Sequence, residues 1–536
     1  MQPRFHMALY WLSAILLATV GCREPAVEAT SDPLREPLST SMVPISVRVD
    51  LDSRRPAEKL SDYGLFADLA NQIPASGVVP YRLNSSSFID AATQEMFAYI
   101  PPGQTVKFLA DGPFDFPIGT ILIQNIRFPN GTTAPDPSSR LVETRLLIHQ
   151  NHGWTAVPYL WNEDQSDAQR AVIGGRTDIT LVGVDGTEKS FSYQTPNMNE
   201  CKQCHSRDGQ TAPIGTTARN LNRNIEVADG TLNQLKHWQS IGLLTGLPDD
   251  LQGIAKLPEW RDEQTASIDQ RARAWLDANC AHCHCATGQA SVSGLDLSFE
   301  QVNPVRFGVY KPPVAAGRGS SGHQFSILPG EPKKSFLLHR IQSIELGVMM
   351  PPLGRTTSDA EGSELLRQWI TQIKPDEKLA EAARNPTQAY KEAVAGGDVE
   401  RGKEIFFKTQ KCVNCHRVAS EGGDVGPNLS DVGKRTQPEY LLESIVDPNA
   451  KIVEGFKTEV VMTDDGRVIT GVVLSEDQYE VVISDANNTH KITKTAIEAR
   501  KTSPNSTMPT MANLLTVDQV SDLIAYLVTL REPPAK

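Results

Sequence analysis

The feature that most constrains this chain is a five-residue pattern, Cys-x-x-Cys-His, that occurs three times, at residues 201–205, 280–284 and 412–416. In this arrangement two thiols add to the vinyl groups of a haem, and the adjacent imidazole binds the iron. Six of the eight cysteines lie in these motifs. The sequence therefore predicts three covalently bound haem c groups, each with its iron.

The motifs name the expected ligands directly. The predicted attachment residues are Cys201, Cys204, Cys280, Cys283, Cys412 and Cys415, and the predicted proximal iron ligands are His205, His284 and His416. A structural zinc site would need a second ligand pair in the same small unit, and no further Cys-x-x-Cys pair exists to supply it. A disulfide framework would leave the adjacent histidines unexplained. Haem attachment is the interpretation that uses every residue of the pattern.

The charge of the chain restricts its partners. The formal net charge is -12, and haem propionates would make it more negative. A negative surface repels the phosphate backbone, which argues against binding to nucleic acid. We expect basic or neutral redox partner proteins instead.

The N-terminus predicts export. Arg4 and His6 precede an apolar run at residues 7–20 that is too short to span a bilayer but suits a signal peptide, residues 1–21. The run ends at Cys22 in a pattern that resembles the bacterial lipoprotein signal, in which the cysteine is lipidated. Thr19 stands where leucine is usual, so simple cleavage is the alternative. We expect a lipid anchor at the periplasmic side of a bacterial membrane, followed by a polar tether over residues 22–42.

Residues 43–262 predict a β-rich domain that contains the first motif. Short apolar or alternating runs are separated by Gly, Pro and Asp-Gly, as in a sandwich or barrel. The runs are 45–49, 96–100, 105–109, 120–126, 145–149 and 179–184. Asp185 and Gly186 mark a hairpin turn, and residues 232–244 suggest a helix. The expected fold class is multidomain α+β, with this β-rich domain followed by two mainly α-helical domains.

Several segments of this region resemble the N-terminal half of a bacterial family of exported dihaem c-type cytochromes. They are Asp62-Tyr-Gly-Leu-Phe66, Val79-Pro-Tyr81, Phe114-Asp-Phe-Pro-Ile-Gly119, Glu143-Thr-Arg145, Gly153-Trp154, Tyr159-Leu-Trp-Asn162 and the stretch from Asn197 to His205. The resemblance covers residues 43–373. It implies that the first two motifs bind haem.

The distal ligand of the first haem is not evident from the sequence. The candidates are His149, His152, His237 and His323. A lone histidine in a polar stretch is more often a surface residue than a ligand. Met198 is too close to Cys201 to reach across the iron.

Residues 263–374 predict a second haem domain. Apolar side chains at helical spacing precede Cys280, which suggests a helix leading into the motif as in class I cytochromes c. Met350 precedes a proline and a probable helix at 358–373, so we expect it to be the distal ligand, with Met349 as the alternative. Core filling is the ordinary role of methionine. Arg340 could meet a haem propionate or remain solvated, and the role of Cys285 is open.

Residues 375–394 predict a linker, and residues 395–536 predict a third haem domain. Gly402 and Phe406 suit the first helix of a class I cytochrome c, and a helix after Thr516 is its expected partner. The loop 426–429 resembles the one whose carbonyl receives the proximal imidazole N–H. Met508, again before a proline, is the expected distal ligand, with Met511 as the less favoured choice.

Four alternating runs at residues 454–497 predict a β insertion within this third domain. A class I cytochrome c would not contain it. The combination resembles the planctomycete-type haem-binding domain, in which a small β element separates the motif from the methionine.

Three functional hypotheses follow. The leading one is a membrane-tethered electron carrier, because two of the three motifs have a candidate methionine for a six-coordinate iron. The rival is a haem enzyme, peroxidase-like or the cytochrome subunit of a dehydrogenase, whose first haem has an open position. The third makes the β-rich domain a docking module for a dehydrogenase or a surface ligand.

Overall fold

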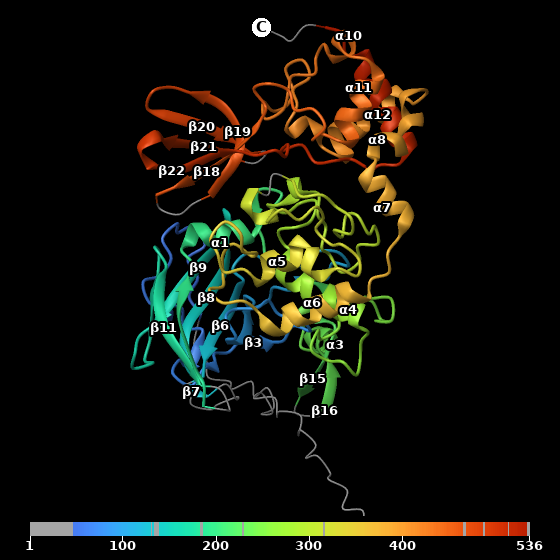
Figure 1. Ribbon diagram of the computed structural model, residues 1–536. Helices are drawn as coiled ribbons and strands as arrows, with labels where there is room; N and C mark the ends of the chain where they lie inside the picture. The colour runs from blue at the N-terminus through green and yellow to red at the C-terminus, as the bar shows by residue number, and fades with distance from the viewer. Residues whose placement is uncertain are drawn as a thin grey trace, which may run out of the picture.

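The computed structural model describes residues 47–129, 131–132, 139–182, 186–227, 230–314, 317–464, 468–485, 488–512 and 514–532. The predicted signal peptide, the lipidation site Cys22 and the tether lie outside the described residues. Among the described residues, no helix is both long and apolar enough to cross a bilayer. Figure 1 shows a β-rich first unit and a helical second unit side by side, with a third unit above them.

The first unit is built on a six-stranded antiparallel sheet with the order β10-β9-β8-β6-β4-β3. Its strands are β3 (Val78–Tyr81), β4 (Thr93–Tyr99), β6 (Ile121–Phe128), β8 (Arg140–Gln150), β9 (Gly153–Trp161) and β10 (Ala168–Arg170). The sheet is covered on both faces because successive side chains alternate between two cores. Leu146 and Ile148 enter one core, and Leu147 enters the other. The predicted runs 96–100, 120–126 and 145–149 fall in these strands, whereas 105–109 yields only the short β5 (Val106–Lys107).

A second sheet of three strands packs beside the first, with the order β12-β11-β7. Its strands are β7 (Gly131–Thr132), β11 (Gly175–Val182) and β12 (Glu188–Thr195). Ile179 and Tyr193 of this sheet share a core with Ile126 and Phe128 of the larger one. The antiparallel pairing of β11 with β12 confirms the predicted hairpin.

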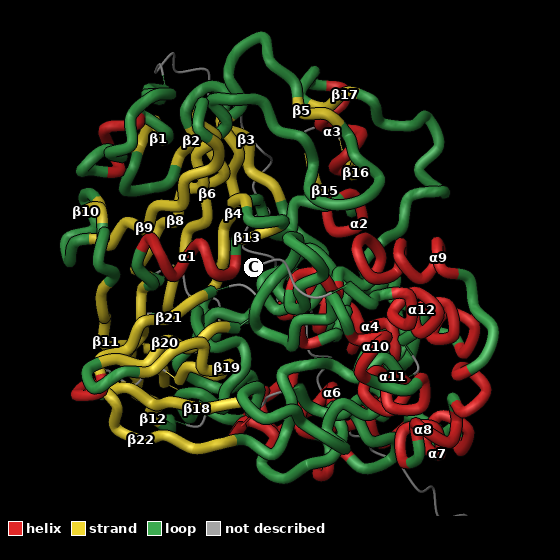
Figure 2. Tube along the Cα trace, turned by 90° about the horizontal axis from the view of Figure 1, so that it is seen from above, coloured by secondary structure: helices red, strands yellow, loops and turns green. Residues whose placement is uncertain are grey.

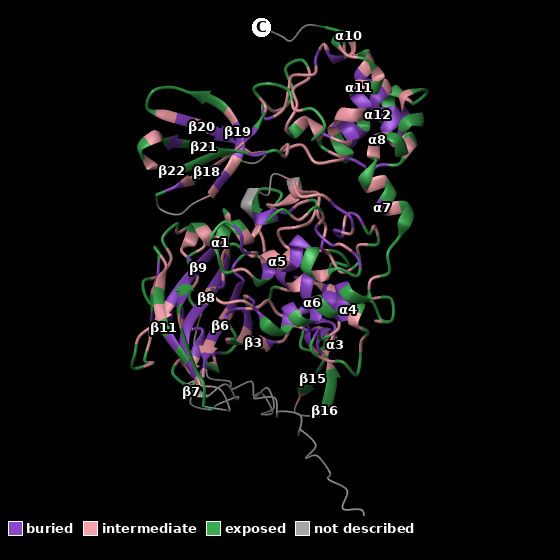
Figure 3. Cartoon of the chain, viewed as in Figure 1, coloured by how far each residue is buried: buried purple, intermediate pink, exposed green. Residues whose placement is uncertain are grey.

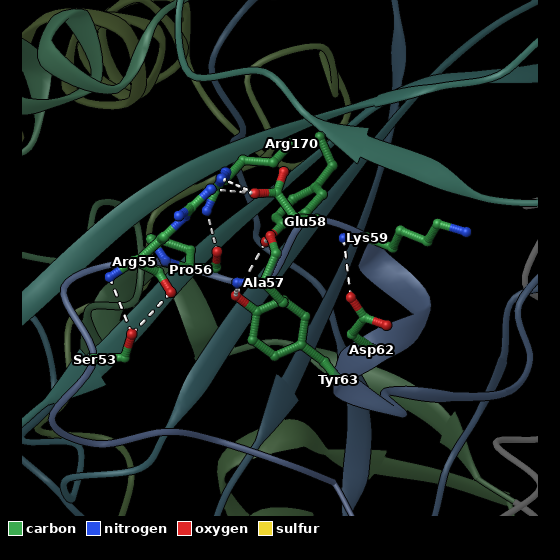
Figure 4. A network of polar contacts seen from close by, with 10 residues as sticks. Ser53, Arg55, Pro56, Ala57, Glu58, Lys59, Asp62, Tyr63 and Arg170 are labelled. Atoms are coloured by element: carbon green, nitrogen blue, oxygen red, sulfur yellow. Dashed lines mark hydrogen bonds and ion pairs between the residues drawn. The ribbon is translucent and has the colours of Figure 1, made fainter.

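A polar network holds the N-terminal part of the first unit, around residues 53–63, in place (Figure 4). Arg170 forms an ion pair with Glu58 at 2.6 Å and donates a hydrogen bond to the carbonyl of Pro56. The hydroxyl of Tyr159 donates to the carbonyl of Ala57 at 2.9 Å. These contacts hold the chain that follows the predicted tether against the sheet.

Short elements complete the first unit. They are a 3₁₀ turn (Leu60–Tyr63), β1 (Phe66–Asp68), β2 (Ile73–Pro74), α1 (Met198–Cys204), β13 (Ser206–Arg207), β14 (Gln210–Thr211), α2 (Ala218–Leu221), β15 (Asn224–Val227), β16 (Gly230–Asn233), α3 (Gln234–Ser240) and β17 (Leu244–Thr245). The helix predicted at 232–244 is therefore shorter than expected. Leu232 pairs with Ile225 in a β-hairpin, and Asn233 caps the helix only from there on.

In the described residues of the second unit, three α-helices surround an aromatic core, and three 3₁₀ turns (Ser291–Ser293, Gly317–Ser320 and Pro332–Lys334) lie between them. The helices are α4 (Ile268–Leu276), α5 (Phe336–Gln342) and α6 (Ala360–Gln372), and α4 continues as a π-helical turn (Asp277–Ala281) into the second motif. Trp275 of α4 and Trp369 of α6 are buried together. The helices approach closely because position 362 is glycine, where a Cβ would lie 2.2 Å from Nε1 of Trp275. Both the helix leading into Cys280 and the helix predicted at 358–373 are confirmed.

The third unit also has a helical core. Its helices are α7 (Glu377–Arg384), α8 (Pro386–Ala389), α9 (Val399–Glu404), α10 (Val432–Arg435), α11 (Pro438–Val446) and α12 (Val517–Thr529). Gly402 lets α9 cross α12, since a Cβ there would lie 2.0 Å from the carbonyl oxygen of Asp522, and the rings of Phe406 and Tyr526 pack 5.7 Å apart. The predicted helix crossing is thus present. Tyr390, which falls in the predicted linker, belongs to this core.

The predicted β insertion is a five-stranded antiparallel sheet with the order β21-β20-β19-β18-β22. Its strands are β18 (Thr458–Thr463), β19 (Val468–Glu476), β20 (Glu480–Ser484), β21 (Thr489–Thr493) and β22 (Ile497–Thr502). The sheet thus runs past residue 497, where the insertion was expected to end. Figure 2 shows it beside the helices of the third unit, and Figure 3 shows buried residues in both parts.

Candidate haem-binding sites

The first motif lies on α1 and its C-terminal turn. Asn197 caps this helix by accepting hydrogen bonds from the backbone N–H groups of residues 199 and 200, while the Glu200 carboxylate accepts from the N–H of Asn197. Cys201 and Cys204 therefore stand one turn apart, with His205 at the helix end. His205 Nδ1 lies 2.9 Å from the carbonyl oxygen of Ala212, which places the proton on Nδ1 and leaves Nε2 for iron.

The second motif follows α4. Ser267 forms a capping box with Gln270 at the start of that helix, so the approach to Cys280 is fixed locally. His284 Nδ1 lies 3.0 Å from the hydroxyl oxygen of Ser293, which can accept a hydrogen bond from the Nδ1–H group. Burial lowers the pKa of His284 to about 4, so the imidazole is neutral at pH 7.

The third motif begins with a 3₁₀ turn (Cys412–Asn414). His416 Nδ1 lies 2.9 Å from the carbonyl oxygen of Pro427, which confirms the predicted loop contact. Gly426 is needed beside it, because a Cβ there would lie 2.6 Å from Cε1 of the imidazole. Burial lowers the pKa of His416 as well.

These arrangements fit haem c at all three motifs. Each offers two thiols one turn apart, and the seven cysteines of the described residues are all free. Each histidine is oriented through Nδ1 by an oxygen of its own unit, as iron-binding imidazoles usually are. Burial also raises the pKa of Cys201, Cys280 and Cys412. The contact with Cys283 instead holds the pKa of Cys204 well below its usual value. These thiols and imidazoles would hold a haem, and the haem would supply reversible one-electron chemistry.

A cavity of about 430 Å³ adjoins the first motif. Its walls include Met96 and Arg145 from the six-stranded sheet, His205 from the first motif, and His282 and Cys285 from the second. Met96 and His282 carry atoms that can bind iron, and sequence reasoning missed both. Nδ1 of His282 is buried and has no hydrogen-bond partner among the described residues. The extra histidine inside the second motif was a visible signal, but the pattern itself gives that position no role.

None of the four histidines considered from the sequence lines this cavity. His149 stacks on Trp154 with centroids 4.3 Å apart, and its Nδ1 lies 2.9 Å from the carbonyl of Phe116. His152 lies in the turn between β8 and β9, and His237 lies in α3. His323 packs against His339 at 5.6 Å. The structure therefore gives none of them a place beside the first motif.

The two predicted distal methionines lie on loops before the last helix of their units. The backbone N–H of Met350 donates to the carbonyl of Arg340 at 3.0 Å, and Arg355 donates to the carbonyl of Met350 at 2.9 Å. Met350 is half-buried, whereas Met349 is buried. Arg340 donates to the carbonyl of Val348 at 2.8 Å, and burial lowers its pKa to about 10.

Met508 lies between β22 and α12, with its N–H donating to the hydroxyl of Ser506 at 3.0 Å. It is half-buried, while Met511 is part of the apolar core of the third unit. Met511 therefore has a packing role that Met508 lacks. Near the second motif, the thiol of Cys285 lies 3.6 Å from the hydroxyl of Thr287, and its role stays open.

A family model for cytochrome c matches residues 399–484. The match begins at α9, includes the third motif and ends within the β insertion. No curated protein matches the chain. The chain thus contains a cytochrome c domain, and it is a haem-binding electron-transfer protein with haem c as the cofactor of that domain.

Proposed function

We propose that this chain is a three-haem c-type cytochrome that carries electrons in an exported compartment, anchored to a membrane by lipid at Cys22. The observation that carries the proposal is the repeated site: three Cys-x-x-Cys-His motifs, each with its imidazole Nδ1 held by an oxygen of its own unit. We also propose class I cytochrome c-like folds for the second and third units. The segment resemblances to dihaem cytochromes and to the planctomycete-type domain agree with this assignment.

Haem stoichiometry tests the proposal. Pyridine haemochrome assay and intact mass of the mature protein should give three haems per chain, and replacing Cys201 and Cys204 with Ala should give two. Replacing Cys285 with Ala is the matched control and should leave three. Two haems in the unaltered protein would mean that the first motif is empty.

One observation favours a second candidate, a haem enzyme. The cavity beside His205 is also lined by Arg145, which is paired with the buried Glu143 at 2.8 Å.

The sixth ligand of the first iron separates the two candidates. An electron carrier requires such a ligand, and Met96 and His282 line the cavity. We expect a low-spin first haem that becomes high-spin in one of the variants His282→Ala and Met96→Leu, measured by EPR. A high-spin haem in the unaltered protein that binds cyanide and consumes peroxide would favour the enzyme.

A further inference from the structure

The first and second motifs lie next to each other in space, although the predicted boundary between the first two domains, at residues 262–263, lies between them in the sequence. Cys204 Sγ, Cys283 Sγ and a ring nitrogen of His282 all lie within 4.8 Å of one another. Cys283 Sγ also lies 3.9 Å from the carbonyl oxygen of Gln203. The second attachment cysteine of each motif therefore faces its counterpart in the other.

Backbone contacts fix this junction immediately beside the motifs. The N–H of Asp208 donates to the carbonyl of Thr287 at 2.9 Å, and Arg207 forms a β-bridge with Gly288. Gly288 permits the tight turn there, since a Cβ would lie 2.3 Å from the carbonyl oxygen of Cys283. The segments that follow the two motifs are thus joined as neighbouring strands are.

Polar contacts farther away hold the same two units together. Arg219 pairs with Asp277 at 2.8 Å, and both side chains are largely buried. The carboxylate of Asp90 accepts hydrogen bonds from the N–H groups of Thr356 and Thr357 at 2.7–2.8 Å. A buried, bidentate arrangement of this kind specifies one geometry. The meeting of the motifs is therefore a built feature of the fold.

We propose that the first and second haems form a pair that meets at the Cys204–Cys283 junction and exchanges electrons directly across it. This inference rests on the proposed three-haem function. Each attachment cysteine becomes a thioether on an edge of its porphyrin, so the position of the sulfur fixes the position of that edge. The exchange is balanced without a further reagent: one iron passes from Fe(II) to Fe(III), the other from Fe(III) to Fe(II), and no proton or bond moves.

A stepwise reductive titration of the full-length holoprotein tests the pair. Reducing one iron removes a positive charge close to the other. For charges roughly 10–15 Å apart at an effective dielectric constant of about 20, the affinity of the second iron for an electron falls on the order of tenfold. The oxidised protein should also show EPR signals of two haems broadened by their mutual spin interaction.

Two cysteine-pair variants provide the comparison. Replacing Cys201 and Cys204 with Ala should abolish both the redox interaction and the broadening, because the first haem is absent. Replacing Cys412 and Cys415 with Ala removes the third haem and should leave both effects in place.

The outcomes separate the pair from the function on which it rests. Three haems that titrate independently with unbroadened spectra would overturn the pair while leaving the three-haem function intact. A count of two haems in the unaltered protein would refute the three-haem function itself. If either variant fails to fold, the titration and the EPR spectra of the unaltered protein still distinguish a coupled pair from independent haems.

Discussion

The substitution Gly426→Ala tests how the third proximal histidine is held. A Cβ at this position would lie 2.6 Å from Cε1 and 2.7 Å from Nδ1 of His416. The imidazole cannot turn aside freely, because Nδ1 is bonded to the carbonyl of Pro427 and the ring follows directly after Cys415 in the chain. The backbone of Gly426 is outside the left-handed region, so the effect would be steric.

The size of the effect follows from these distances. Carbon atoms in contact prefer roughly 3.5–4.0 Å, so the ring or the loop must move by about 1 Å. Overpacking of this kind costs about 1–3 kcal/mol. Loss of the hydrogen bond to Pro427 adds about 1 kcal/mol. Alanine has less conformational freedom than glycine in the unfolded chain, and this difference stabilises the folded state by about 0.4–1 kcal/mol. We expect the free energy of unfolding of the third unit to fall by about 1–4 kcal/mol.

Denaturant unfolding of the holoprotein, followed through the long-wavelength Met–iron absorption, measures this change. Gly253→Ala is the control, because no atom lies within 4 Å of its added Cβ and its backbone is also outside the left-handed region. It should leave the midpoint unchanged. If Gly426→Ala is as stable as the control and keeps the full absorption band, the close contact with His416 does not constrain the ring.

Three other predictions address the ligands, the anchor and pH. Met350→Ala and Met508→Ala should each remove one Met–iron absorption and lower that haem's reduction potential in a redox titration, without altering the first haem; unchanged spectra would reject these ligands. Cys22→Ala should release the protein from washed membranes, and retention would contradict the lipid anchor. The hydrogen bonds from Arg401 lower the pKa of Asp522 in the folded protein. The charged carboxylate therefore stabilises the fold at pH values above the pKa of Asp522 in the unfolded chain. This stabilisation is lost as the pH falls through the pKa of Asp522 in the folded protein. Asp522→Asn should therefore flatten the acid side of a stability-versus-pH curve, and an unchanged slope would refute this role.

Local pattern was enough to predict the elements around the second and third motifs. The apolar spacing before Cys280 predicted α4, and the glycine at 402 with the aromatic ring at 406 predicted the crossing with α12. The carbonyl that orients His416 was also expected from the loop that follows the motif. In each case the residues that carry the signal lie within one helix or one short loop, even where their partner, as for Gly402, lies on the distant helix α12.

The first site could not be predicted in the same way, because its walls come from distant parts of the chain. Met96 and Arg145 reach the cavity from β4 and β8, and His282 reaches it from the second motif. Each is an ordinary residue in its own segment. Only the pairing of strands and the packing of the first unit on the second bring them together. The helix predicted at 232–244 is longer than the observed α3 for a local reason, because Leu232 pairs with Ile225 across a short hairpin, and this pairing competes with helical propensity.

The contacts of the third unit suggest where it joins the proposed electron path. Ser293, whose hydroxyl lies beside His284, is followed by Gly294, and a Cβ on Gly294 would lie 3.7 Å from a methyl carbon of Leu514. Leu514 packs against the core of the third unit. The loop that orients the second proximal histidine therefore lies close to the third unit, while the second motif itself meets the first at Cys283. If electrons follow these contacts, the second haem is the intermediate between the other two. A variant that lacks the second haem should then transfer no electrons between the first haem and the third.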